Sequence, residues 1–431
     1  MNTCRLLIFL CLALTAQLTQ AGPKIERWQT LAGTRVLFVE DHSLPIIDVE
    51  VDFAAGAAHE GAGQEGVAGL TRSLIDLGAG GMDETQIASR LADLGARLSG
   101  GVDLDRASLT LRTLSMVDKR GPALDLLQAI LSRPTFPVEV LAREKARSVA
   151  ALKEALTRPD TIASKAFWSA MYAEHPYGRQ ATPESVSTLQ RADVLAFHAT
   201  HYGAARASLA IVGDLTRSQA EALAEQLTRG LPAGPAIGDL AAPRLPIAGE
   251  QRIEHPAAQA HLLIGMPALK RGDPDFFPLA VGNYSLGGGG FVSRLMKEVR
   301  DKRGLAYSVH SYFLPLQQLG PFQIGLQTKK AQANDALKVT REVLVAFLEQ
   351  GPSEVELQAA KQNLIGSFPL RLDSNRKILE NVAMIGFYDL PLDYLDRYPE
   401  NIERVTIAEI RAAFARRVRP AHLVTVVVGG E

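Results

Sequence analysis

Two histidines have a spacing that suits metal chemistry. His198 and His201 lie in the segment FHATHYG, so one helical turn separates them and both imidazoles would share one face of a helix. Two imidazoles placed in this way supply half of a zinc site, but no third ligand is evident near them. We therefore interpret the pair as ordinary surface or core histidines. An atypical zinc site, in which a carboxylate joins the pair, is the alternative.

Two other histidines have simpler interpretations. His59 and Glu60 precede an expected helix, and we assign them to a solvated loop, with a contact to substrate as the alternative. His175 belongs to the segment HPYGR, where Pro176 and Gly178 mark a tight turn. A structural role is therefore expected for His175.

Two longer stretches resemble the M16 (pitrilysin and insulinase-like) zinc peptidases. The first is AAGAAHEGAGQEGVAGLTRSLIDLGAGG, from Ala54 to Gly81, which is similar to the family's active-site helix with its His-x-x-Glu-His motif. The second is NYSLGGGGFVSRLMKEVRDKRGLAYSVHSYF, from Asn283 to Phe313, which resembles the glycine-rich and Arg/Tyr segment of the family's C-terminal half. The second match is the more specific because it is long. With HPYGR and an internal repeat, the resemblance covers nearly all of the chain after residue 21.

The first stretch departs from the family at its zinc motif. When Gly66-Val67-Ala68 is aligned with the family's Gly-Leu-Ala lead, the three motif positions fall on Gly69, Arg72 and Ser73. The family uses two imidazoles to hold zinc and the glutamate between them to activate water. Glycine cannot coordinate a metal, and arginine repels one and cannot accept a proton. The family's third ligand, a glutamate, falls near Ala151. We therefore expect no metal in this chain.

The second stretch contains the residues that the resemblance assigns to substrate. Arg300 and Tyr307 lie seven positions apart, as in the M16 Arg/Tyr pair that reaches the scissile bond from the C-terminal half. Both side chains donate hydrogen bonds, so they suit the holding of a peptide carbonyl or its developing oxyanion. A phosphate-binding loop is not indicated, because its Lys-Ser/Thr ending is absent. The family's glycine-rich loop, which lets a peptide backbone approach closely, corresponds to Gly287, Gly288, Gly289 and Gly290. A plain turn is the alternative for this run.

The sequence also repeats internally. Around residues 230 to 249 it shifts to Gly, Pro and Ala with few charges, as in an extended connector. Similar segments recur on either side: LGAGGM matches LGGGGF and GARLS matches GLAYS at an offset of 209, and LTLRT matches IGLQT at 215. Each half closes with an apolar strand, SLAIVGD or LVTVVVGG. We expect one lobe at residues 22–229, a connector at 230–249 and a homologous lobe at 250–431.

Both halves alternate between strand and helix patterns. Strand-like alternation or β-branched enrichment is found in Thr34 to Val39, Ile46 to Phe53, Ala107 to Thr113 and Phe322 to Thr328. Helical spacing is found in Pro122 to Leu131, Val138 to Leu156, Asn334 to Leu348 and Glu354 to Ile365. These patterns predict an α+β unit, an antiparallel sheet packed with helices, that is used twice. The helix containing Val67 to Leu77 is expected to match the one around Ser293 to Arg300.

Comparing the two halves shows whether the fold itself requires an arginine and a tyrosine at these positions. At the local offset of 209, Arg300 faces Leu91 and Tyr307 faces Leu98. Leucines suffice in the first half, so the fold does not require a polar pair. We therefore expect Arg300 and Tyr307 to have a role in function.

The N-terminal segment predicts export. Arg5 precedes an apolar run at residues 6–14, and small residues lead to Ala21, as in a signal peptide that is cleaved after Ala21. The apolar run is shorter than the roughly 20 residues that span a bilayer. Both cysteines, Cys4 and Cys11, lie in this leader, so the mature chain has no disulfide and no cysteine nucleophile. The formal net charge of −1 indicates neither nucleic acid nor an anionic membrane as a partner.

The resemblance implies a subunit rather than an enzyme. M16 proteins of this length often work as pairs, in which one chain brings zinc and His-x-x-Glu-His and the other brings the Arg/Tyr pair. This chain has the second set only, as in M16B-type subunits without the zinc motif. We expect an exported non-catalytic subunit, periplasmic where an outer membrane exists and secreted otherwise. Its expected partners are a homologous M16 subunit that holds the zinc and a peptide or unfolded protein substrate, with no membrane contact after leader cleavage. An autonomous metallopeptidase and a pure binding or assembly protein are the alternatives.

Overall fold

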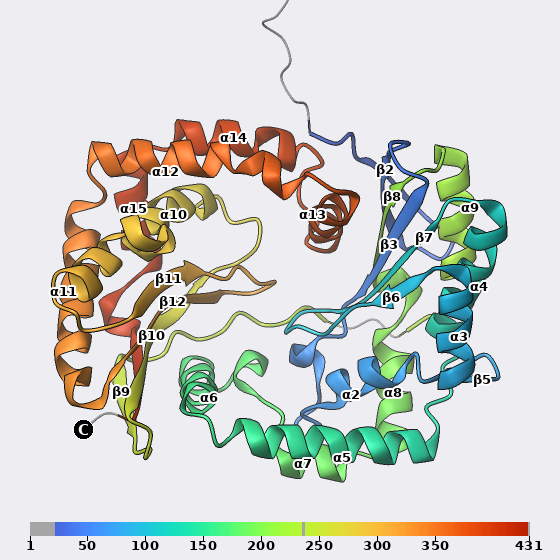
Figure 1. The fold of residues 1–431 in the computed structure, drawn as a ribbon, viewed down its shortest axis with the longest axis horizontal. Coiled ribbons are helices and arrows are strands. Elements are labelled where there is room, and N and C mark those ends of the chain that lie inside the picture. The colour runs from blue at the N-terminus through green and yellow to red at the C-terminus, as the bar shows by residue number, and fades with distance from the viewer. Residues whose placement is uncertain (1–21, 235–237, 430–431) are drawn as a thin grey trace, which may run out of the picture.

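Two lobes face each other in this computed structural model, which describes residues 22–234 and 238–429 (Figure 1). The predicted leader, residues 1 to 21, lies outside the described residues. The first lobe contains a six-stranded sheet with the strand order β1-β2-β8-β3-β7-β6. Its strands are β1 Glu26–Gln29, β2 Arg35–Glu40, β3 Ile46–Phe53, β6 Arg97–Ser99, β7 Ala107–Leu114 and β8 Ala207–Gly213.

The second lobe repeats this sheet. Its strand order, β11-β12-β10-β13-β9, equals the first order read from β6 to β2. In both sheets one pair is parallel, β2 with β8 and β9 with β13, and the other pairs are antiparallel. The strands are β9 Gly249–Ile253, β10 Gln259–Leu269, β11 Ser308–Phe313, β12 Gly320–Lys329 and β13 Val424–Val428. The α+β fold with two homologous lobes is therefore confirmed.

Helices cover the outer face of each sheet (Figure 1). The first lobe has α2 Val67–Leu74, α3 Glu84–Leu94, α4 Val117–Ser132, α5 Val138–Ala155, α6 Pro159–Met171, α7 Pro183–Thr188, α8 Arg191–His201 and α9 Arg217–Thr228, with a small hairpin of β4 Gly78–Ala79 and β5 Met82–Asp83. The second has α10 Phe276–Asn283, α11 Ala333–Gln350, α12 Glu354–Gly366, α13 Asn375–Phe387, α14 Tyr394–Arg404 and α15 Ile407–Arg417. No helix in these described ranges is long and apolar enough to cross a membrane.

Several helices recur in the second lobe with the same length and a constant offset. α6 and α13 are both 13 residues long and begin 216 positions apart, and α8 and α15, with 11 residues each, keep the same offset. Between α9 and β9 the chain forms no helix or strand in its described part, and it contacts both lobes. His175 donates to the carbonyl of Ala241, and His422 donates to that of Pro246. His175 thus has the structural role that the sequence predicts.

One expected match between helices is wrong. We expected the helix containing Val67 to Leu77 to correspond to the segment from Ser293 to Arg300. In the structure α2 corresponds to α10, because each follows a central strand, β3 or β10, and they begin 209 positions apart. The segment from Ser293 to Arg300 corresponds instead to α3, because both precede an edge strand, β6 or β11. The offset of 209 was correct, but the expected pairing of helices did not follow it.

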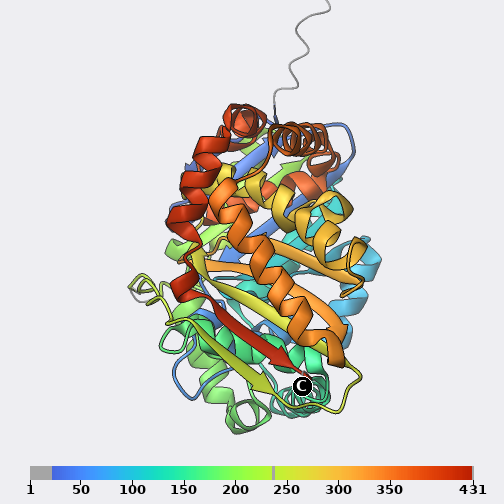
Figure 2. The ribbon, with the colours of Figure 1, turned by 90° about the vertical axis from the view of Figure 1, so that its left-hand side faces the viewer.

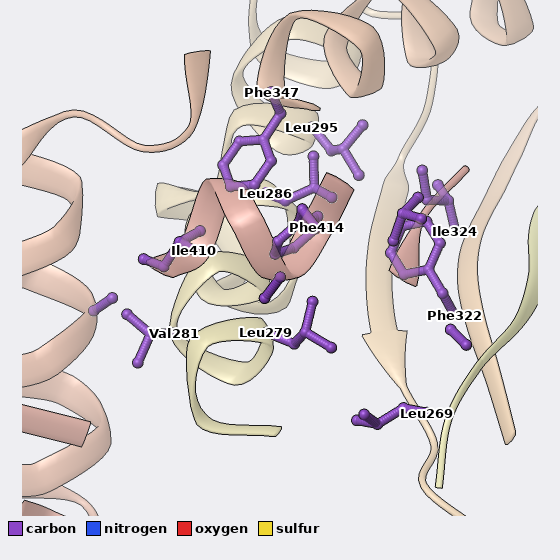
Figure 3. Close-up of a cluster of buried hydrophobic side chains, with 14 of the residues drawn as sticks. Leu269, Leu279, Val281, Leu286, Leu295, Phe322, Ile324, Phe347, Ile410 and Phe414 are labelled. Carbon is purple, nitrogen blue, oxygen red and sulfur yellow. The ribbon is translucent and has the colours of Figure 1, made fainter. Parts of the chain in front are cut away.

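Each lobe has its own apolar core between its sheet and its outer helices. Along β7 every second residue is buried, because successive side chains of a strand point to opposite faces. In the second lobe, Phe322 and Ile324 of β12 face Leu279 of α10, Phe347 of α11 and Phe414 of α15 (Figure 3). Figure 2, turned toward this lobe, shows its helices lying across the strands and β13 (red) beside β9 (yellow-green).

Each lobe also contributes one helix to the sheet of the other. α13 belongs to the second lobe but packs on β8, β3 and β2 of the first, and its counterpart α6 packs on β13 and β10 of the second. Leu37 and Val212 of the first sheet accordingly join the apolar core of the second lobe. Gly386 permits the close approach, because a Cβ there would lie 2.6 Å from Ser208 Oγ. The two lobes therefore share a buried interface.

Candidate functional site

The three zinc-motif positions lie on α2 and hold no zinc ligand. Gly69 and Ser73 are exposed one turn apart, and a Cβ added at Gly69 would meet no other atom within 4 Å. The Ser73 hydroxyl donates to the carbonyl of Leu70 at 2.9 Å. The position of the third ligand, Ala151, is exposed on α5, as is the nearby Glu154. In the ranges that the structure describes, no group of three or more His, Cys, Asp or Glu residues is placed to hold a metal.

Arg72, at the position of the family's glutamate, has a structural role. It is only 9% exposed. Its Nε donates to the carbonyl of Ser108 at 2.7 Å, and a terminal nitrogen donates to that of Ser99 at 2.8 Å. A longer ion pair, 3.7 Å, joins it to Asp76 on the next turn. Arg72 therefore fixes α2 to β6 and β7.

His59 and Glu60 are not in a solvated loop, so that expectation is wrong. Glu60 is 6% exposed, and its carboxylate accepts the backbone N–H groups of Gly66 (3.0 Å) and Ala68 (2.9 Å). These are otherwise unpaired donors at the start of α2. Burial raises the pKa of Glu60 to about 7, and the two N–H groups oppose this shift. His59 packs against His201 with ring centres 5.7 Å apart, and burial lowers its pKa to about 4.

His198 and His201 have different surroundings. The ring of His198 donates to the carbonyl of Leu131 at 3.1 Å and stacks on Tyr202 with ring centres 4.9 Å apart. Burial lowers the pKa of His198 to about 4. His201 lies 4.4 Å from the ring centre of Phe197. The described residues bring no carboxylate to this pair, so the geometry gives the atypical zinc site no support.

Arg300 and Tyr307 come together on the surface of the second lobe. Arg300 lies in a π-helical turn, Met296–Asp301, and Tyr307 directly precedes the edge strand β11. The Cζ atom of Arg300 is 5.5 Å from the ring centre of Tyr307, which is 85% exposed. It is also 4.9 Å from the ring centre of Phe291. Sequence reasoning missed Phe291, although an aromatic residue directly after the glycine run was an available signal.

The repeat comparison holds for Arg300. Gly95 and Gly304 correspond, because both end the helix before the edge strand and have φ angles of 63° and 61°. In this left-handed region glycine is favoured. Counting back from these glycines places Arg300 opposite Leu91, as expected.

The comparison of Tyr307 with Leu98 is wrong. Strand β6 begins two residues after its glycine, at Arg97, whereas β11 begins four residues after its glycine, at Ser308. Arg97 and Ser308 occupy the same register position in the two sheets. The second lobe therefore has two additional residues here, and Leu98 corresponds to the buried Val309. Tyr307 stands in the added turn.

The glycine run is explained by packing within its own lobe. A Cβ on Gly287 would collide with the side chain and backbone of Ser311, and one on Gly289 would lie 2.7 Å from the carbonyl of Tyr284. Gly290 adopts a φ of 61°, which favours glycine. Its role in binding a peptide backbone stays a prediction.

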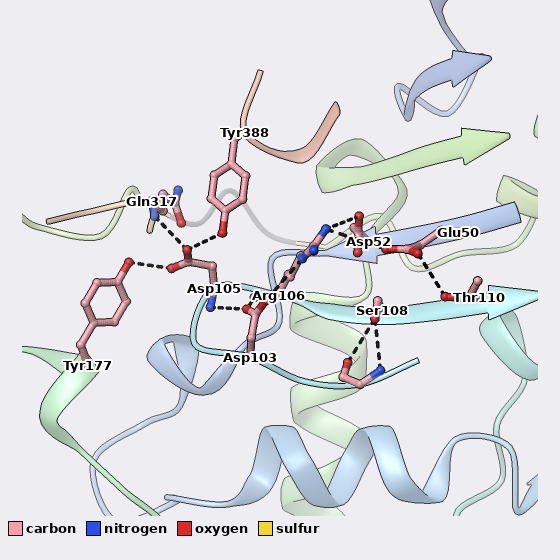
Figure 4. Close-up of polar contacts among 11 residues, drawn as sticks. Glu50, Asp52, Asp103, Asp105, Arg106, Ser108, Thr110, Tyr177, Gln317 and Tyr388 are labelled. Atoms are coloured by element: carbon pink, nitrogen blue, oxygen red, sulfur yellow. Dashed lines mark hydrogen bonds and ion pairs between the residues drawn. The ribbon is translucent and has the colours of Figure 1, made fainter. Parts of the chain in front are cut away.

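A buried carboxylate joins the two lobes (Figure 4). Asp105 of the first lobe accepts the hydroxyl of Tyr177 at 2.6 Å, the hydroxyl of Tyr388 at 2.8 Å and the backbone N–H of Gln317 at 2.8 Å. Tyr388 and Gln317 belong to the second lobe. Burial raises the pKa of Asp105, although these donors lower it. The sequence offered no signal for this network.

A second charged group adjoins it (Figure 4). Arg106 pairs with Asp52 at 2.9 Å and with Asp103 at 3.4 Å, and its Cζ lies 5.6 Å from the ring centre of Phe387 on α13. Asp52 is fully buried, and burial raises its pKa well above the usual range, against the opposing effect of Arg106. Both groups thus stabilise the junction of the lobes rather than a catalytic centre.

The fold and the altered motif define a two-lobed homologue of zinc peptidases. A family model described as insulinase (peptidase family M16) matches residues 35–183, and one described as peptidase M16 inactive domain matches residues 188–364. Among solved structures, the chain is similar to the peptidase M16 inactive domain from Pseudomonas fluorescens. The identity is 39% and the TM-score 0.91, over 94% of this chain and 98% of that one. The chain belongs to peptidase family M16.

Curated relatives include both peptidase and non-peptidase names. The chain is 26% identical over 381 residues to the non-peptidase homolog YmxG of Helicobacter pylori, covering 87% of each. It is 31% identical over 229 residues to the uncharacterized zinc protease SCO5738 of Streptomyces coelicolor, covering 50% of this chain and 49% of that one. A protease structure from Helicobacter pylori shares the fold, with a TM-score of 0.85 at 18% identity. At the zinc motif this chain has Gly69, Arg72 and Ser73, so the family's His-x-x-Glu-His residues are replaced at all three positions.

Proposed function

We propose that this chain is the non-catalytic subunit of an exported heterodimeric M16-type zinc endopeptidase. A homologous subunit supplies zinc and His-x-x-Glu-His, and this chain binds and orients the peptide substrate through Arg300 and Tyr307. One contrast carries the proposal. A buried arginine, Arg72, has replaced the family's glutamate, whereas the Arg/Tyr pair stands together at the surface.

The surroundings of the pair suit an extended peptide. β11 is the outer strand of its sheet and pairs only with β12 among the described strands. On β11 the carbonyl of Ser311 accepts a hydrogen bond from the side chain of Asn283 at 2.9 Å. A peptide that lies along this edge passes Tyr307, the residue before the strand. Arg300 and Tyr307 then donate to the scissile carbonyl, and donors preorganised at that point lower the cost of the developing negative charge.

The first experiment examines the chain lacking residues 1 to 21 by itself. It is expected to hold no stoichiometric zinc and to hydrolyse no peptide, because Gly69, Arg72 and approximately Ala151 stand in place of acid and imidazole groups. Metal analysis and a peptide cleavage assay measure both. About one tightly held zinc per chain, lost on replacing His198 or His201, would establish the atypical site instead.

The second experiment adds the partner. A homologous chain with an intact His-x-x-Glu-His motif is purified alone and together with this chain, and complex formation is followed by size-exclusion chromatography. We expect an equimolar complex that cleaves peptides faster than the partner alone. A partner that forms no complex, or whose activity is unchanged in the complex, would contradict the proposal.

Export is tested on the protein recovered from its native source. Cleavage after Ala21 leaves Gly22 as the first residue, which intact-mass spectrometry identifies. A chain that retains Met1 in the cytoplasmic fraction would contradict export.

A further inference from the structure

An arginine lies close to two exposed aromatic rings on the second lobe. The Cζ atom of Arg300 is 4.9 Å from the ring centre of Phe291 and 5.5 Å from that of Tyr307. Phe291 is 69% exposed and Tyr307 is 85% exposed. Within the described ranges, the one ion pair of Arg300 is a long contact of 3.9 Å with Asp301. The guanidinium thus lies within cation–π range of both rings and keeps N–H donors for another partner.

We propose that Phe291 is a positioning residue, which holds the guanidinium of Arg300 in the orientation that binds a peptide carbonyl. This inference rests on the proposed function. It adds a third residue, Phe291, to the Arg/Tyr pair and assigns it a role through Arg300 rather than through contact with the peptide.

The internal repeat shows that burial does not explain Phe291. At the offset of 209 its counterpart is Met82, and the counterpart of Arg300 is Leu91. Met82 and Leu91 are both partly buried and pack against the apolar core of the first lobe. In the second lobe the same two positions are occupied by Arg300 and by Phe291, whose side chain is mostly exposed to solvent. Core packing therefore does not explain the aromatic ring at this position.

Two local distortions of the second lobe bring the rings to the arginine. The first is the π-helical turn Met296–Asp301, which contains Arg300, whereas the counterpart α3 is an α-helix. Such turns are frequent at functional sites. The second is the added turn that contains Tyr307. Phe291 itself follows the glycine run, in the short 3₁₀ turn Gly290–Val292. Three separate segments therefore converge on one side chain.

Stacking has a clear physical effect on an arginine. Aromatic faces attract the planar cation, and an arginine held in this way still presents N–H donors in the plane of its guanidinium. A free arginine samples many rotamers and loses that freedom on binding a ligand. An arginine that is already held loses less, so its hydrogen bonds to a carbonyl contribute more.

The first test uses the chain alone, so it does not depend on the partner. In a sample with ¹⁵N-labelled arginine, ring currents from Phe291 and Tyr307 shift the Nε–H signal of Arg300. Phe291→Leu is expected to move this signal toward the position of an unstacked arginine, and Phe291→Tyr is expected to leave it in place. The neighbouring exposed residue provides a control, Val292→Ala. An Arg300 signal that is unchanged by Phe291→Leu would overturn the positioning role.

The second test is a double-mutant cycle in the reconstituted pair. Phe291→Leu is expected to lower turnover about two- to fivefold, the effect of one exposed cation–π contact, and Phe291→Tyr to restore it. In the Arg300→Leu background Phe291→Leu should have no further effect, because Phe291 acts through Arg300. An equal loss in both backgrounds would overturn the inference. If Phe291→Leu shifts the Arg300 signal but Arg300→Leu leaves turnover unchanged, Phe291 does contact Arg300, and the proposed role of Arg300 in catalysis is wrong.

Discussion

At the scale of single residues, each of the three zinc-motif positions holds a residue that suits its environment. Gly69 and Ser73 face solvent, whereas Arg72 donates to two strand carbonyls. The sequence alone predicted that arginine at this position serves neither as ligand nor as base. It could not predict the partners, because Ser99 and Ser108 lie 27 and 36 residues away and depend on how β6 and β7 pair. The same applies to His59 and Glu60, whose burial depends on tertiary packing.

Replacing Arg72 tests its structural role. Arg72→Met keeps the apolar stem but removes both hydrogen bonds from a charged donor, which are worth about 1.5 to 3 kcal/mol each. The free energy of unfolding in urea is expected to fall by roughly this amount or more. The control is Ser73→Ala, on the exposed side of the same helix, for which a change within about 0.5 kcal/mol is expected. Equal stability of the two variants would show that Arg72 does not fix α2.

Glu60 predicts a dependence of stability on pH. Its pKa is about 7 in the folded chain against an ordinary value of 4.5. The folded state therefore binds the Glu60 proton more tightly than the unfolded state does. The protonated carboxyl contributes its full stabilisation of the fold below pH 4.5, and this contribution is lost as the pH rises through 7. The loss is at most about 3 kcal/mol. Glu60→Gln cannot titrate and should be less sensitive to pH between about 5 and 8. Parallel pH profiles of unfolding for both proteins would contradict the assigned shift.

At the scale of elements, the sequence predicted the repeat of one α+β unit. An offset of 209 relates the segment from α2 to Gly95 to the segment from α10 to Gly304. An offset of 216 relates α6 to α13 and α8 to α15. The exchange of α6 and α13 between lobes was not predictable, because a helix pattern shows which face is apolar but not which sheet covers that face. The two residues added before β11 were also missed. Their insertion left the local motif GLAYS similar to GARLS.

The close contact of α13 with the first sheet can be tested at Gly386. A side chain there would meet Ser208 Oγ at 2.6 Å and Leu37 Cδ1 at 2.8 Å. Gly386→Val is expected to cost about 1 to 3 kcal/mol of unfolding free energy through overpacking. The matched control is Gly366→Val at the end of α12, where an added Cβ meets nothing within 4 Å. A Gly386→Val protein as stable as the control would show that α13 is not held against the sheet.

At the scale of the whole molecule, reciprocal helix exchange and the Asp105 network make the two lobes interdependent. The partners in this network, Gln317 and Tyr388, are 212 and 283 residues from Asp105, which explains why the sequence offered no signal for it. In the proposed heterodimer, such a chain would move as one unit. Opening for substrate is therefore expected between subunits rather than between these two lobes.

Asp105→Ala tests this interdependence. The substitution leaves the buried hydroxyl of Tyr177, the partly buried hydroxyl of Tyr388 and one backbone N–H without their acceptor, at a cost of at least about 2 kcal/mol. Circular dichroism and the fluorescence of Trp28, in the first lobe, and Trp168, on the exchanged helix α6, should report one shared transition in the parent chain and one at lower urea in the variant. Two separated transitions in the parent chain would contradict interdependent lobes.

The central claim is that this chain acts on a partner's substrate through Arg300 and Tyr307. The most direct measurement is the turnover of the reconstituted pair carrying Tyr307→Phe or Arg300→Leu, with assembly checked by size-exclusion chromatography and Arg303→Leu as a control for loss of charge. Loss of one donor to a developing oxyanion costs about 2.7 to 4 kcal/mol, so turnover should fall about 100- to 1000-fold in either variant but not in the control. Full turnover in a correctly assembled Tyr307→Phe or Arg300→Leu pair would contradict the claim and leave this chain as a binding or assembly subunit.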